Sequence, residues 1–138
     1  MTKKRQIQTS KTTKINGKST KVNVLDKRTV DSTDVPHTQL FVHRKLGDED
    51  ESKPEYMISH KHSGWGVLSG RCTKKSMIAC AQFLWSQMPN ELVDLLSTQE
   101  SDSLNYNKRI KEIYAENPTV QKRMVTALQA TRNYMETL

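Results

Sequence analysis

The chain has 138 residues, of which 34% are hydrophobic, and its mean hydropathy is −0.76. This length suits one domain with a modest core and is too short for two ordinary domains. Because the sequence contains neither an apolar run of membrane-spanning length nor an apolar N-terminal segment typical of signal peptides, we expect an intracellular protein (cytoplasmic, or in the nucleoid or nucleus) without a membrane partner.

Positive charge is concentrated at the N-terminus. The whole chain has a net charge of +7, and residues 1–28 alone have a net charge of +8, because nine Lys and Arg residues face a single acid, Asp26. Residues 29–70 have a net charge of −3 and residues 71–138 a net charge of +2. The remainder of the chain is therefore close to neutral, and the basicity belongs to the N-terminal segment.

Residues 1–36 are dominated by Lys, Thr and Ser, with one aliphatic grouping at Val22, Val24 and Leu25. Such a segment buries too little apolar surface to offset the entropy lost on ordering. We therefore predict that residues 1–36 form a flexible basic arm that is disordered when free. Val22–Val24 would form a short edge strand only on binding a partner.

A basic arm of this kind favours binding to phosphates, because each neutralised phosphate releases a counterion and makes binding dependent on salt. Deleting residues 1–28 should then flatten that salt dependence. The alternative is a solubilising tail without a partner. The candidate nucleic-acid-binding residues of the arm are Lys3, Lys4, Arg5, Lys11, Lys14, Lys18, Lys21, Lys27 and Arg28.

Residues 37–97 are predicted to form the core of the domain. Alternating apolar and polar residues indicate strands at His37–Leu46, Tyr56–Lys61 and Trp65–Leu68. An acidic loop ending at Pro54 connects the first two strands, and Ser63-Gly64 turns the second into the third. The result is a three-stranded antiparallel meander, the smallest sheet that is stable with a helix on one face. A glycine inside the third strand, Gly66, indicates a bulge or a close backbone approach.

An amphipathic helix should cover this sheet. Thr73 is a suitable N-cap, and Pro89-Asn90 ends the helix. Cys80 belongs to its apolar stripe, so a buried free thiol is expected rather than a disulfide with Cys72. The stripe consists of Met77, Cys80, Ala81, Leu84 and Met88.

Residues 98–138 are predicted to form a C-terminal helical hairpin, packed on the core or extending from it. After a short helix at Glu91–Gln99 and a polar linker at Thr98–Asp102, Ser103 and Asn117-Pro118 mark two helix starts. The joint lacks the Gly-containing turn of a helix-turn-helix, so docking to a partner or self-association is at least as well supported as base reading. The predicted fold class is thus α+β.

His60 and His62 are two residues apart and would share a face of a strand, with Cys72 or His43 as a third metal ligand. No established metal-binding spacing accompanies them, and exposed histidines near a hairpin tip explain the pattern more simply. Cys72 lies beside basic residues near a helix start, which would lower a thiol pKa, but nothing orients a base toward it. We therefore expect no cofactor, no metal and no catalytic residues.

The hairpin gives the best candidate surface outside the arm. Its basic and aromatic residues would gather at one end of the sheet and helix, with Trp65 either stacking on a base or packing in the sheet. The residues proposed to contact nucleic acid there are Lys61, Trp65, Arg71, Lys74 and Lys75.

These features predict a small non-enzymatic nucleic-acid-binding or accessory protein, with DNA and RNA equally open. The alternative is an adaptor or inhibitor that docks on a larger protein through its hairpin and C-terminal helices, with a protein that itself handles nucleic acid as one option.

Overall fold

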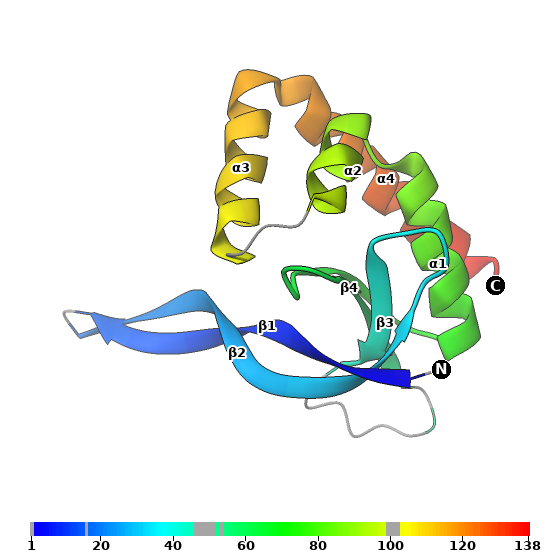
Figure 1. The fold of residues 1–138 in the computed structure, drawn as a ribbon, viewed down its shortest axis with the longest axis horizontal. Coiled ribbons are helices and arrows are strands. Elements are labelled where there is room, and N and C mark those ends of the chain that lie inside the picture. The colour runs from blue at the N-terminus through cyan, green and yellow to red at the C-terminus, as the bar shows by residue number, and fades with distance from the viewer. Residues whose placement is uncertain (1, 16, 46–51, 53, 99–102) are drawn as a thin grey trace.

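The computed structural model describes residues 2–15, 17–45, 52, 54–98 and 103–138, and only the backbone of residues 2, 8–15, 19–28, 103 and 104. Within these residues the chain forms an antiparallel sheet followed by helices, which confirms the α+β class. The strands follow one another in the sheet in chain order (Figure 1). The elements are β1 (Thr2–Ile15), β2 (Lys18–Asp34), β3 (Leu40–Arg44), β4 (Glu55–His60), β5 (Gly66–Arg71), α1 (Lys74–Gln87), α2 (Asn90–Ser97), α3 (Ser103–Glu116) and α4 (Pro118–Glu136).

The described sheet has five strands rather than the three predicted, because the segment expected to be disordered forms β1 and β2. Two signals in the sequence explain the difference. Seven threonines lie between residues 2 and 34, and β-branched Thr favours strands although hydropathy counts it as polar. Ile15 pairs with Lys18 across Asn16-Gly17, a dipeptide typical of two-residue hairpin loops, and Gly17 has the positive φ of 78° that glycine adopts without strain.

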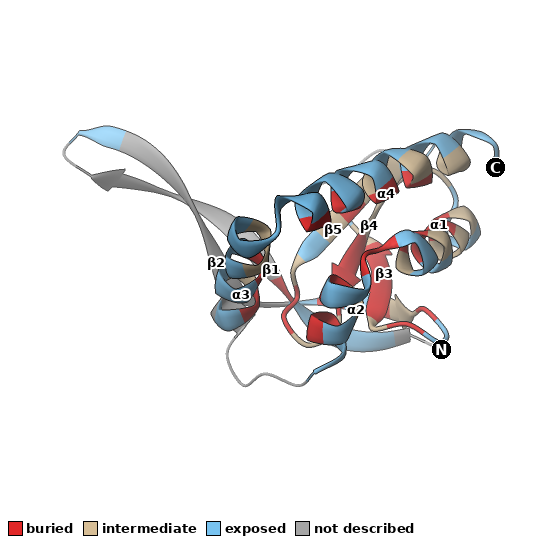
Figure 2. Ribbon diagram, turned by 90° about the horizontal axis from the view of Figure 1, so that it is seen from above, coloured by how far each residue is buried: buried red, intermediate tan, exposed pale blue. Residues whose placement is uncertain are grey.

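The β1–β2 hairpin has two parts. The foot (residues 2–7 and 29–34) joins the body, since Ser32–Asp34 of β2 pair with Phe41–His43 of β3. The distal ribbon (residues 8–15 and 18–25) projects away from the body (Figures 1 and 2). Between the two parts the register shifts, so that residues 26–28 of β2 lie opposite Ile7 alone. Such a bulge bends the strand and increases its twist, which directs the distal ribbon outward.

The helices cover one face of the sheet, and buried residues line the space between the two layers (Figure 2). The predicted stripe of α1 is buried as expected, and the Thr73 side chain caps the helix by accepting a hydrogen bond of 3.1 Å from the Ser76 N–H. α4 packs against α1 and α3, and its predicted cap is also confirmed because the Asn117 side chain accepts from the Thr119 N–H. This layer contains the main hydrophobic core.

A second, smaller core lies on the opposite face of the sheet. Leu40 and Val42 belong to the main core, whereas Phe41, between them on β3, is fully buried against Ile7 and Val30 of the foot. Because side chains alternate along a strand, β3 is buried on both faces. The foot is therefore a covering element of the domain and not an appended tail.

Two smaller predictions are confirmed in the described residues. Ile58 pairs with Leu68 and Ser59 with Gly66, so an extra residue, Val67, creates a bulge beside Gly66, whose missing Cβ would lie 3.3 Å from the Met57 sulfur. Cys80 is buried, and both cysteines are free. The acidic run Asp48–Glu51 and most of the polar linker, residues 99–102, lie outside the described residues. No helix in the described part of the chain is long and apolar enough to cross a membrane.

Candidate nucleic-acid interface

The three basic residues of the foot are paired with carboxylates on the neighbouring strand. Arg5 Nε and Nη2 donate to the two carboxylate oxygens of Asp34 at 2.9 and 3.0 Å, and its guanidinium carbon lies 5.5 Å from the centre of the Phe41 ring. Lys3 Nζ lies 3.3 Å from Asp34, and Lys4 forms an ion pair with Asp31. These cations thus contribute to holding the hairpin together, whatever else they bind.

The Arg5–Asp34 pair is the strongest electrostatic contact of the foot. Burial alone would raise the pKa of Asp34, but the hydrogen bonds from Arg5 and Lys3 and the positive charges of Arg5 and Lys61 outweigh it and hold that pKa below its usual range. Both side chains are about three-quarters shielded from solvent, with exposures of 23% and 26%. A bidentate Arg–carboxylate pair in that setting is more stabilising than an exposed one.

The distal ribbon has a different charge balance. Residues 8–28 contain six basic residues and only Asp26 as an acid. In the register each lysine lies opposite a neutral residue: Lys11 opposite Val22, Lys21 opposite Thr12, Lys14 opposite Ser19 and Lys18 opposite Ile15. Lys18 is exposed, and the other predicted basic contacts of this region lie outside the described side chains, namely Lys11, Lys14, Lys21, Lys27 and Arg28. With eight residues per strand, the distal ribbon is about 25 Å long.

The structure separates the second set of predicted contacts into two groups. Lys61 and Trp65 lie at the turn between β4 and β5, whereas Arg71, Lys74 and Lys75 follow the opposite end of β5. Arg71 lies 3.7 Å from Glu55, and Trp65 is half-buried against the main core. The single patch predicted from the sequence is therefore divided by the length of a six-residue strand, about 20 Å.

His60, expected to be exposed, is a buried structural residue. Its Nε2 donates to the Leu96 carbonyl at 2.7 Å, and its Nδ1 accepts from the Ser63 hydroxyl at 2.8 Å. The Tyr106 ring lies edge-on to it at 4.9 Å. Burial lowers the pKa of His60 to about 4, so the ring is neutral at pH 7. Sequence reasoning missed this because Leu96 and Tyr106 are remote in the chain.

Neither the thiol site nor the metal site considered above is assembled. Both nitrogens of His60 are occupied by Ser63 and Leu96, and burial raises the pKa of Cys72, opposite to the lowering considered from the sequence. In the part of the chain that the structure describes, no three His, Cys, Asp or Glu side chains are grouped so that they could hold a metal ion.

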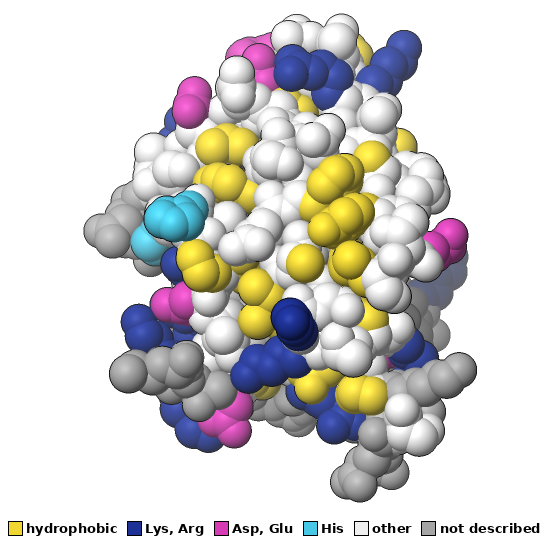
Figure 3. All heavy atoms as spheres, turned by 90° about the vertical axis from the view of Figure 1, so that its right-hand side faces the viewer, with side chains coloured by type: hydrophobic (Ala, Val, Ile, Leu, Met, Phe, Trp, Pro, Cys, Tyr) yellow, Lys and Arg dark blue, Asp and Glu magenta, His cyan; other side chains and the backbone are white. Residues whose placement is uncertain are grey.

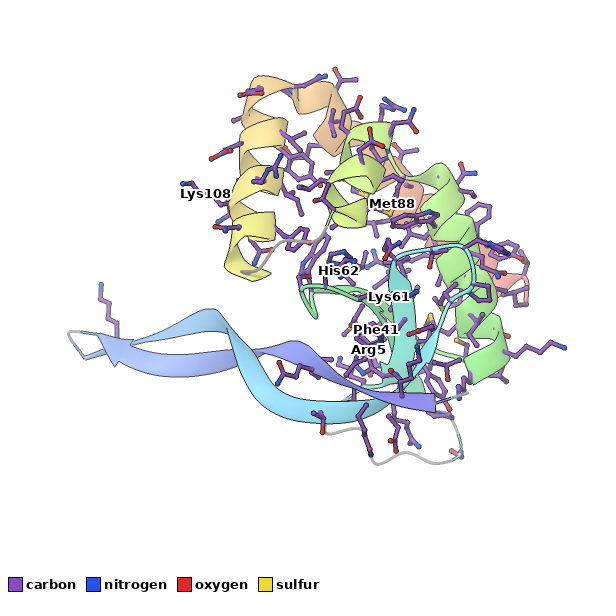
Figure 4. The ribbon with its side chains drawn as sticks, viewed as in Figure 1. Arg5, Phe41, Lys61, His62, Met88 and Lys108 are labelled. Atoms are coloured by element: carbon purple, nitrogen blue, oxygen red, sulfur yellow. The ribbon has the colours of Figure 1, made fainter. Side chains whose placement is uncertain are left out.

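The structure assembles a basic hollow that the sequence did not indicate. The turn between β4 and β5 lies beside β1, so that Lys61 and His62 meet Lys4 and Arg5 of the foot (Figure 4). The hollow has a volume of about 260 Å³. It is lined by Lys4, Arg5, Gln6, Lys61, His62, Ser63 and Gly64.

Comparison of the chain with protein-family models, curated proteins and solved structures found no match.

Proposed function

We propose that this protein binds nucleic acid through the distal ribbon of its β1–β2 hairpin, without relying on base sequence. One observation carries the proposal: a two-stranded ribbon projects from the body, and its charge is strongly positive, whereas most of the positive charge of the foot is offset by Asp31 and Asp34.

The dimensions of the ribbon support this function. Paired strands lie about 4.8 Å apart, and a two-stranded ribbon fits the major groove of B-DNA, which is about 12 Å wide. At about 25 Å the ribbon covers most of a helical turn of about 34 Å. Its lysines would neutralise phosphates and release counterions, which provides affinity for any sequence.

The foot stabilises the ribbon and fixes its direction. An isolated two-stranded hairpin is marginally stable in water, and the distal ribbon pairs only with itself. The foot pairs with β3 and covers Phe41, so it fixes the direction in which the ribbon leaves the body. A partner then meets an oriented ribbon and avoids the entropic cost of ordering a free tail.

The test is binding to mixed-sequence DNA and RNA between 50 and 200 mM salt, with Lys11, Lys14, Lys18 and Lys21 all changed to Gln. We expect the slope of log affinity against log salt for duplex DNA to fall by about 3 to 4, since each lost phosphate contact removes about 0.9. A matched variant removes four exposed charges from α3 and α4 by changing Lys111, Lys122, Arg123 and Arg132 to Gln. Equal losses in both variants would contradict a role specific to the ribbon.

A second variant shortens the hairpin. Because Gln8 pairs with Leu25, residues 9–24 can be replaced by Asn-Gly without changing the foot. This is sharper than deleting residues 1–28, which would also remove Arg5 and Ile7 and uncover Phe41. The shortened protein should keep its fold and bind nucleic acid no more tightly than the lysine variant.

Docking on a larger protein is the second candidate. Hydrophobic side chains gather on the face formed by α1 and the C-terminal end of α4 (Figure 3), where Phe83 of α1 stacks on Tyr134 of α4 at 4.6 Å. The same binding experiment separates the two candidates. Absence of nucleic-acid binding by the wild-type protein even at 50 mM salt would favour docking over the ribbon proposal.

A further inference from the structure

We infer that the basic hollow between the foot and the β4–β5 turn is a binding site for one backbone phosphate of the nucleic acid. The inference rests on the proposed function and adds to it a specific contact outside the ribbon. Its basis is the meeting of Lys4 and Arg5 with Lys61 and His62 around a space of about 260 Å³.

The hollow offers hydrogen-bond donors. Lys61 Nζ donates to the Thr38 carbonyl at 3.0 Å, and an ammonium group has two further N–H bonds to give. Arg5 uses Nε and Nη2 on Asp34, so its Nη1 hydrogens are outside that ion pair. His62 is half-buried, and neither of its ring nitrogens is hydrogen-bonded to a described residue. Two or three donor-bearing side chains lining one space are suited to phosphate oxygens.

The local charge also favours an anion. Lys3, Lys4 and Arg5 outnumber the two acids with which they pair, Asp31 and Asp34. Lys61 adds a further positive charge, which also acts on Asp34. Consistent with this, burial lowers the pKa of His62, and the positive charges of Arg5 and Lys61 lower it further. A phosphate entering the hollow would meet a net positive field in a partly desolvated place.

The position of the hollow favours a backbone phosphate over a free one. Gln6 lines it, and the distal ribbon begins at Gln8, two residues further along β1. The hollow therefore lies on the body side of the bulge, next to the start of the ribbon, where the backbone of a nucleic acid bound along the ribbon would reach the body.

The test compares two doubly substituted proteins. The first combines Lys61→Gln with His62→Gln, and the control combines Lys122→Gln with His37→Gln, which removes one lysine and one histidine that are both exposed. At about 0.1 M salt and pH 6.5 we expect the first to bind a mixed-sequence duplex about tenfold more weakly, as one lost phosphate contact predicts, and the control to change less than twofold. His62→Gln alone serves as a second variant, because it removes no hydrogen bond to a described residue and should still weaken binding about threefold.

A separate measurement uses inorganic phosphate. Titration of the wild-type protein should shift the ring NMR signals of His62 and leave those of His37 unchanged. A shift of His62 without any loss of duplex affinity in the two His62 variants would overturn the inference, because the hollow would then hold free phosphate only. If the ribbon lysines matter for binding and neither His62 variant does, the inference alone fails. If the wild-type protein binds no nucleic acid, the proposed function fails as well.

Discussion

The foot and the distal ribbon of the β1–β2 hairpin are built from similar residues, yet the structure uses them differently. In the foot, Arg5 is paired with Asp34 and Ile7 packs on Phe41. In the distal ribbon, each lysine lies opposite a neutral residue and the strands pair only with each other. The cations of the foot that stabilise the fold are those beside Asp31 and Asp34, whereas the lysines of the distal ribbon have no acid opposite them in the register.

The bulge at residues 26–28 is the boundary between these two parts. On its body side, β-sheet pairing continues into β3, so the strand gains apolar contacts that offset its ordering entropy. Beyond the bulge, the described pairing joins β1 and β2 to each other and does not bring them against the body. A net positive charge there costs the fold little, and in the function that we propose it would attract phosphates.

The largest expected effect on stability comes from Phe41→Ala, which removes the side chain that the foot covers. Full burial of Phe41 predicts a loss of about 3 to 5 kcal/mol in the free energy of unfolding, measured by urea denaturation with tryptophan fluorescence. Replacing residues 9–24 by Asn-Gly should cost less than about 1 kcal/mol, because it leaves the described core residues Ile7, Val30 and Phe41 in place. Comparable losses in the free energy of unfolding from the two changes would contradict the conclusion that the foot stabilises the fold and the ribbon does not.

The second-largest effect on stability is expected from acid. The pKa of His60 is about 4 in the folded protein, below the usual 6.5, so the unfolded chain binds more protons between these values and stability falls as pH drops from 6.5 to 4. The expected loss is about 3 kcal/mol at most. His43 acts in the same direction, since burial lowers its pKa too. Urea midpoints across this pH range should decline in the wild type.

Substitutions in the ion pairs of the foot should have the smallest effect on stability. A double-mutant cycle on Arg5 and Asp34 should show a coupling of about 1 to 2 kcal/mol, since the pair is bidentate and largely shielded from solvent. The same cycle on Lys4 and Asp31, whose side chains are each 70% exposed, should show less than about 0.5 kcal/mol. A larger coupling energy for the exposed Lys4–Asp31 pair would contradict the expectation that shielding from solvent strengthens these ion pairs.

The elements between residues 37 and 138 could be predicted because their signals are local. Helix caps such as Thr73 and Asn117 act within three residues, and the apolar stripe of α1 repeats over a few turns. The hairpin was missed because its stability depends partly on Phe41, which lies outside the segment. The candidate site was only partly predicted for the same reason. Lys61 and Arg5 were both named, but their meeting around one hollow requires β1 and the β4–β5 turn to lie side by side.

The sequence alone determined the α+β class, the helices with their caps, the buried free cysteine and the concentration of positive charge before residue 28. These properties depend on residues that are neighbours in the chain or on composition. Only the tertiary structure decided which cations are paired, that His60 is buried, and that the N-terminal segment extends the sheet. Each of these depends on contacts between residues far apart in the sequence, such as Arg5 with Asp34 and His60 with Leu96.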